Sequence, residues 1–67
     1  MGTASATTGS RVKELRLAAG LSQEKLAAKA GLSWHTIARL ESEGGVRLES
    51  LRQVAQALEV PVSELVG

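Results

Sequence analysis

Apolar residues recur every three or four positions along most of this chain, which is the spacing that buries one face of an α-helix. Glycines interrupt the pattern at residues 20, 31 and 44–45 and divide it into separate segments. The apolar stripes consist of Val12, Leu15 and Ala19; Leu26, Ala27 and Ala30; Ile37 and Leu40; and Leu51, Val54, Ala55 and Leu58. The pattern therefore predicts helices and no strands.

Serine residues mark the expected helix starts. Ser10, Ser22 and Ser33 each precede an apolar stripe, and a serine hydroxyl accepts hydrogen bonds from the free N–H groups of a first helical turn. Pro61 suits the start of a last, short helix, because its missing N–H costs nothing there. We expect helices at about 10–19, 22–30, 33–42 and 48–58, and a fifth helix after Pro61.

These elements predict an all-α protein, a five-helix orthogonal bundle that occupies residues 10–67. Residues 1–9 are small, polar and aperiodic, and are expected to form a disordered arm. A chain of 67 residues allows one domain, close to the lower size limit for a single core. Without cysteines, that core has to be held by aliphatic packing and not by disulfides or a Cys-ligated zinc ion.

The stretch from residue 23 to residue 42 has the pattern of a helix-turn-helix. Two helices that cross near a right angle need a small residue where their backbones approach, and Ala27 supplies it. Gly31 permits a left-handed turn at no steric cost, and Ser33 then caps the second helix. Ile37 and Leu40 would hold that helix on the body of the protein, leaving its other face free to enter a DNA major groove.

The chain from Ser10 to the C-terminus resembles the phage-repressor-like, xenobiotic-response-element class of helix-turn-helix DNA-binding domains. The resemblance runs through SRVKELRLAAGLSQEKLAAKAG, LSWHTIARLE and LESLRQVAQALEVPVSEL. It implies a lambda-repressor-like fold with residues 33–42 as the recognition helix. It also implies a bacterial-type transcriptional regulator whose partner is double-stranded DNA, bound by a homodimer on a palindromic site.

The resemblance assigns base contacts to one face of the recognition helix. The positions that would face the bases are Ser33, Trp34, His35, Ala38 and Arg39. Arg39 is the best candidate for direct readout, because its guanidinium matches the O6 and N7 acceptors of guanine. The alternative is a solvated arginine or an ion pair with Glu43, one helical turn further on. His35 could contact a base or a phosphate or be a solvent-exposed side chain, and Ala38 could touch a thymine methyl group or nothing.

Trp34 is the only tryptophan in the chain, which contains no tyrosine and no phenylalanine. Three roles are open for it. It could contact a thymine methyl group or a sugar, fold back over the seam between the second and third helices, or anchor a protein partner.

Phosphate contacts are expected from Gln23, Thr36 and Arg47. Gln23 opens the second helix, where free N–H groups attract an anion. In similar domains a Gln here grips the DNA backbone and buttresses the recognition helix; the alternative is simple capping. The loop SEGGVR is short and has Glu43 where a basic residue would be expected, which leaves Arg47 as its one cation. By the resemblance, Arg16 and Glu41 match a partly buried ion pair between the first and third helices; the alternative is two independent surface charges.

Eight basic and seven acidic residues give a net charge of +1, which supports nucleic-acid binding only weakly. Neither a nucleophile with a base nor a metal-ligand cluster stands out, so we expect no enzyme activity, cofactor, metal or small-molecule ligand. Without a signal peptide or a long apolar run, we expect a cytoplasmic protein with no membrane contact.

The C-terminal end carries apolar residues that would need covering, and these predict the dimer interface: Val60, Val62, Leu65 and Val66. A second class of function stays open. The same fold could serve as a protein-interaction module, antitoxin-like or coactivator-like, with Trp34 as the anchor. A structural bundle with no specific target is a third possibility.

Overall fold

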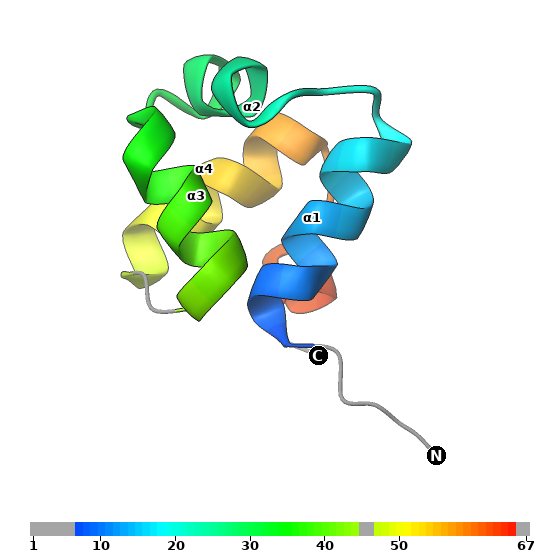
Figure 1. The fold of residues 1–67 in the computed structure, drawn as a ribbon. Helices are drawn as coiled ribbons and strands as arrows, with labels where there is room; N and C mark the ends of the chain where they lie inside the picture. Colours follow the sequence, from blue (N-terminus) through cyan, green and yellow to red (C-terminus); the bar gives the residue numbers. More distant parts are fainter. Residues whose placement is uncertain (1–6, 45–46, 66–67) are drawn as a thin grey trace.

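The computed structural model describes residues 7–44 and 47–65. These residues form four α-helices and one short 3-10 turn, with no strand among them. The helices are α1 (Thr8–Ala18), α2 (Gln23–Ala30), α3 (Trp34–Glu43) and α4 (Leu48–Leu58), and the turn is η1 (Val62–Glu64). Figure 1 shows α1 and α3 side by side below α2, with α4 passing behind them. None of these helices is long and apolar enough to cross a membrane.

The turn between α2 and α3 has the predicted chemistry. Gly31 ends α2 in a left-handed conformation, at φ 72° and ψ 30°, which glycine adopts without steric cost. Ser33 precedes α3 and its hydroxyl accepts a hydrogen bond from the Thr36 N–H at 3.3 Å. Ser22 caps α2 in the same way through the Lys25 N–H. The helix-turn-helix is thus built by one left-handed glycine between two serine-capped helices.

The first helix begins earlier than the sequence pattern predicted. Thr7, and not Ser10, is the N-cap, and its hydroxyl accepts a hydrogen bond from the Ser10 N–H at 3.1 Å. Gly9, which we expected in a disordered arm, lies inside α1 and is buried. A Cβ atom at Gly9 would lie 2.4 Å from the Leu40 carbonyl oxygen, so α1 approaches the end of α3 too closely for any side chain. Residues 1–6 of the expected arm lie outside the described residues.

The prediction of a fifth α-helix after Pro61 is wrong. In the described part of the chain this segment is the single 3-10 turn η1, closed by hydrogen bonds from Glu64 N–H to the Pro61 carbonyl and from Leu65 N–H to the Val62 carbonyl. Residues three apart lie on the same side of a 3-10 turn. The turn therefore directs both Val62 and Leu65 toward the bundle, where Leu65 has no exposed surface.

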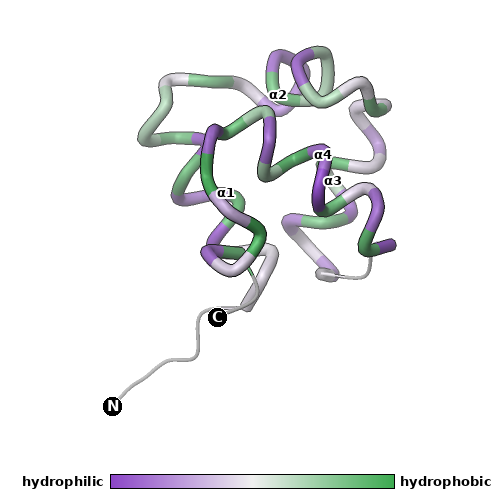
Figure 2. The backbone as a smooth tube through the Cα atoms, turned by 180° about the vertical axis from the view of Figure 1, so that it is seen from behind, coloured by the Kyte–Doolittle hydropathy of each residue, from purple (hydrophilic) through white to green (hydrophobic). Residues whose placement is uncertain are grey.

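The core draws on every element. Its fully buried large side chains are Val12, Leu26, Ile37, Leu40, Val54 and Leu65. Figure 2 shows hydrophobic and hydrophilic residues following each other along each helix, as expected when one face is buried. Because Ile37 and Leu40 hold one side of α3 in this core, the opposite side of α3 is left at the surface.

Candidate nucleic-acid interface

An open groove lies between the exposed side of α3 and the start of α4. We call it the α3–α4 groove, and it is lined by His35, Thr36, Ala38, Arg39, Ser42, Arg47 and Ser50. Four of these residues belong to the predicted base or phosphate contacts on the recognition helix. Ser42 and Ser50 also line the groove and were not predicted. Ser42 lies three residues after Arg39, and Ser50 three residues after Arg47, so each serine shares a helix face with a predicted arginine. The groove therefore combines cationic groups with hydroxyls, which suits a phosphate backbone and base edges.

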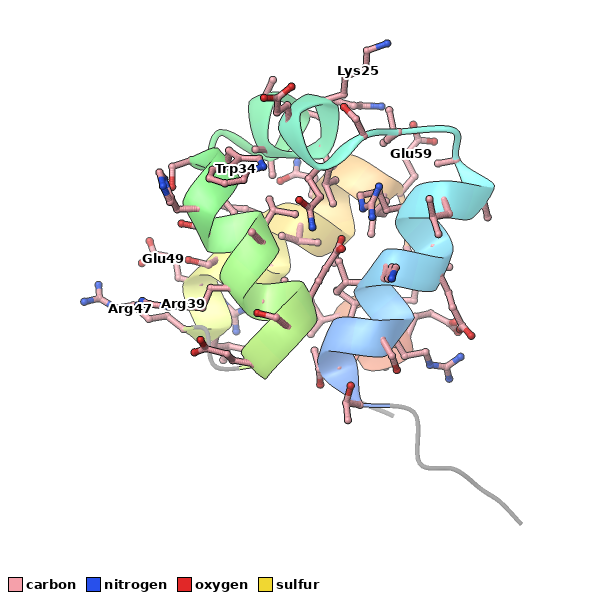
Figure 3. All side chains as sticks on the ribbon, viewed as in Figure 1. Lys25, Trp34, Arg39, Arg47, Glu49 and Glu59 are labelled. Carbon is pink, nitrogen blue, oxygen red and sulfur yellow. The ribbon has the colours of Figure 1, made fainter. Side chains whose placement is uncertain are left out.

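Arg39 and Arg47 come from different elements and extend from the same side of the molecule (Figure 3). Arg39 lies on α3, where its Nε is 3.8 Å from Oε1 of Glu43. The two side chains are 70% and 69% exposed. The ion-pair alternative for Arg39 is thus realised in the free protein, although so exposed a pair is weak. Arg47 is the N-cap of α4 and its side chain makes no capping hydrogen bond, so it can extend toward a ligand.

Trp34 lies at the surface, at the first residue of α3 (Figure 3). The residue is 45% exposed, and its ring and the His35 ring are T-shaped to each other, with centroids 4.6 Å apart. Trp34 is thus not part of the buried core, and its role stays a prediction. Trp34 is not among the residues that line the α3–α4 groove.

Ser33 and Thr36 form a local pair at the start of α3. The two hydroxyl oxygens lie 3.0 Å apart, and the Ser33 hydroxyl also caps the helix. Ser33 is therefore already hydrogen-bonded in the free protein, whereas Thr36 faces the α3–α4 groove. A direct base contact by Ser33 would have to share its hydroxyl with the cap.

Arg16 and Glu41 form the ion pair that the resemblance implied. Arg16 Nε donates to Glu41 Oε2 at 2.6 Å and Nη2 donates to Oε1 at 3.1 Å, and the two side chains are only 9% and 5% exposed. Arg16 Nη1 also donates to the Leu21 carbonyl oxygen at 2.8 Å. The pair links α1 to α3 and is fully hydrogen-bonded, which is the condition under which a buried pair is tolerated.

Gln23 is turned toward this pair. Its Nε2 donates a hydrogen bond to Glu41 Oε1 at 3.0 Å, so the amide buttresses α3 in the free protein. The predicted phosphate contact thus has to come from the rest of the amide or from the backbone. The Lys25 N–H already donates to the Ser22 hydroxyl. The N–H groups of Gln23 and Glu24 have no carbonyl four residues earlier in the helix, and they are the ones that could meet an anion.

The predicted dimer residues are mostly held within the bundle. Leu65 is fully buried and cannot provide a dimer contact in this conformation, because η1 directs it into the core. Val60 and Val62 are partly buried against the same core, and Val66 lies outside the described residues. In the described part of the chain, no group of three or more His, Cys, Asp or Glu residues could hold a metal ion.

Comparisons with known proteins agree with this geometry. The family model described as Helix-turn-helix matches residues 12–65. No curated protein is similar enough in sequence to count as a match. Fourteen chains of solved structures are similar to this one, including the following two. The restriction-modification controller protein C.AhdI from Aeromonas hydrophila is 38% identical, with a TM-score of 0.84, over 90% of this chain and 92% of that chain.

The second is the N-terminal DNA-binding domain of SinR from Bacillus subtilis. It is 30% identical, with a TM-score of 0.81, over 87% of each chain. Each likeness extends over nearly the whole of this chain and of the chain in the solved structure. The family match covers every helix of the described structure after the first turn of α1. The chain therefore belongs to the helix-turn-helix family, in the phage-repressor-like, xenobiotic-response-element class.

Proposed function

We propose that this chain is the sequence-specific DNA-binding domain of a transcriptional regulator, and that α3 enters the major groove. The observation that carries the proposal is the α3–α4 groove, in which Arg39 and His35 from α3 and Arg47 from the N-cap of α4 line one open surface. Membership of the helix-turn-helix family and the likeness to a controller protein and to a DNA-binding domain support it.

We assign a different DNA contact to each predicted residue in the groove and beside it. Arg39 projects from the middle of α3 and would read a guanine through two hydrogen bonds, while Trp34 and Ala38 would offer apolar contact to a thymine methyl group. Arg47 and Thr36 would hold phosphates that flank those bases. Gln23 would support α3 through Glu41 while the start of α2 meets a further phosphate.

A two-fold dimer is part of the proposal. One domain of this size covers little DNA, so useful affinity needs two half-sites about one helical turn apart. The partly buried Val60 and Val62 border the surface that we assign to the second copy. Leu65 is no longer included, since it belongs to the core.

Selection from a pool of random-sequence duplexes tests this function. The protein should enrich a palindromic site, and its affinity for that site should fall with salt at a slope of about −3 per monomer, because only three or four phosphates are contacted. Arg47→Ala should weaken binding and flatten this slope by about 1. Lys13→Ala is the matched control, since it removes one exposed cation from α1, outside the α3–α4 groove. A pool with no enriched sequence would contradict the proposal.

The half-exposed ring of Trp34 supports a second candidate, a protein-interaction module of the same fold. An exposed tryptophan is a frequent anchor at protein interfaces. If that is its role, Trp34→Ala should abolish capture of a protein partner and leave DNA affinity unchanged.

A further inference from the structure

We propose that Glu43 determines sequence specificity, by holding Arg39 in position for base readout and by opposing contacts with phosphates at other sequences. This inference rests on the proposed DNA-binding function. Glu43 is not among the residues that line the α3–α4 groove, and nothing in the helix-turn-helix pattern requires an acid there.

Glu43 contacts Arg39 at Nε, so the pair leaves the terminal guanidinium nitrogens of Arg39 available for a base. Glu43 Oε1 approaches Nε of Arg39, at 3.8 Å, from one turn further along α3. Guanine readout uses a fork of two N–H donors directed at O6 and N7. A carboxylate on this side of Nε weakly favours Arg39 conformers that stay near Glu43, and it is compatible with a guanidinium whose terminal nitrogens point away from the helix.

Helix stability does not account for the acid at this position. Glu43 is the last residue of α3, where the helix dipole disfavours a negative charge, and this last turn contains no basic residue. An ion pair with the basic residue on the N-terminal side is also the weaker of the two orders at a spacing of four. Glu43 therefore does not stabilise the C-terminal end of α3, and we assign it a role in positioning Arg39 instead.

The charge of Glu43 acts differently on correct and incorrect DNA. At an unrelated sequence, Arg39 can only exchange Glu43 for a phosphate, and the carboxylate itself is repelled by the DNA backbone. At the correct sequence, Arg39 gains directional hydrogen bonds to a base in addition to its charge contacts. The net charge of the whole chain is only +1, so removing one negative charge beside the groove would raise it to +2.

The experiment compares Glu43→Gln with the unmodified protein on two labelled duplexes of equal length, a selected site and an unrelated sequence, over a series of salt concentrations. We expect Glu43→Gln to bind the unrelated duplex about five times more tightly at 0.1 M salt, with a salt slope steeper by about 0.9. The ratio of the two affinities should fall at least about threefold, because the selected site gains less. Circular dichroism checks that the variant is folded.

Two controls make the result specific. Glu59→Gln removes the same charge on the side of the molecule away from Arg39 and Arg47, and should leave the affinity ratio unchanged (Figure 3). In an Arg39→Ala background, Glu43→Gln should no longer alter discrimination at the base pair that Arg39 reads, because the residue it positions is missing.

Two outcomes would overturn the inference, and they can be told apart. An affinity ratio that Glu43→Gln changes no more than Glu59→Gln does would remove Glu43 from specificity and leave the DNA-binding proposal intact. Equal affinity of the unmodified protein for both duplexes would overturn the proposed function itself, and this inference with it.

Discussion

Arg16 on α1 and Glu41 on α3 are joined by two hydrogen bonds, at 2.6 and 3.1 Å, in a site where each side chain is more than nine-tenths buried. Gln23, at the start of α2, donates to the same carboxylate at 3.0 Å. Glu41 thus links α3 to both α1 and α2. The direction in which α3 presents its outer face depends on this contact as well as on the packing of Ile37 and Leu40.

Breaking the pair should be costly for stability. We expect Arg16→Ala to lower the free energy of unfolding by about 3 kcal/mol, more than any other single charge deletion, and Glu41→Ala to do nearly as much, because either change leaves a buried charge without its partner. Urea unfolding measures both. The coupling energy from the double-mutant cycle should exceed about 1 kcal/mol.

The chain contains its own control for that cycle. Arg39 and Glu43 form an ion pair of the same residue types at the surface, about 70% exposed, and their stability coupling should be no more than a few tenths of a kcal/mol. Equal coupling energies in the two cycles would contradict the structural role that we give to Arg16 and Glu41.

Gly9 should not tolerate a side chain. Gly9→Ala would place a Cβ atom 2.4 Å from the Leu40 carbonyl oxygen and 2.8 Å from that of Glu41, so α1 would have to move away from α3. We expect a loss of about 2–3 kcal/mol in unfolding free energy, as for an overpacked core position. Gly20→Ala is the comparison, because nothing lies within 4 Å there and only its positive φ opposes the change. A smaller loss at Gly9 than at Gly20 would show that the helices part easily.

The start of α1 shows why part of the fold escaped prediction. The sequence pattern located α2, α3, α4 and the turn correctly, since their stripes and caps are local signals. Gly9 carries no such signal: its importance comes from a contact with α3 that lies about thirty residues away in the chain. Leu65 is a similar case, since an apolar residue near the C-terminus suits a dimer surface as well as a core, and η1 decides between them.

The candidate site was predictable to a similar degree. Arg39, His35 and Arg47 follow from helical spacing and the family resemblance, and the structure places all three in the α3–α4 groove. Ser42 and Ser50 were missed because serine on a helix face is too common to stand out. The inward turn of Gln23 depends on where Glu41 lies in three dimensions, which the sequence does not specify.

Trp34 provides a direct optical test of its own role. With 45% of its surface exposed, it should emit at long wavelength in the free protein, and the emission should change when a selected duplex is added. Trp34→Ala should weaken DNA binding and cost about 1 kcal/mol or less of stability, as expected for a surface position. Short-wavelength emission from the free protein, with a loss of about 3 kcal/mol in the variant, would place the ring over the core instead.

We propose that the outer face of α3 reads DNA bases, and the variant Arg39→Ala is the sharpest test of this role. Affinities should be measured for the selected site and for a set of duplexes in which each base pair is changed in turn. We predict that Arg39→Ala loses discrimination at one base pair, with a cost of about 1–3 kcal/mol on the selected site, whereas Arg47→Ala weakens binding evenly across the set. Unchanged preferences at every base pair in Arg39→Ala would show that Arg39 does not read a base from α3.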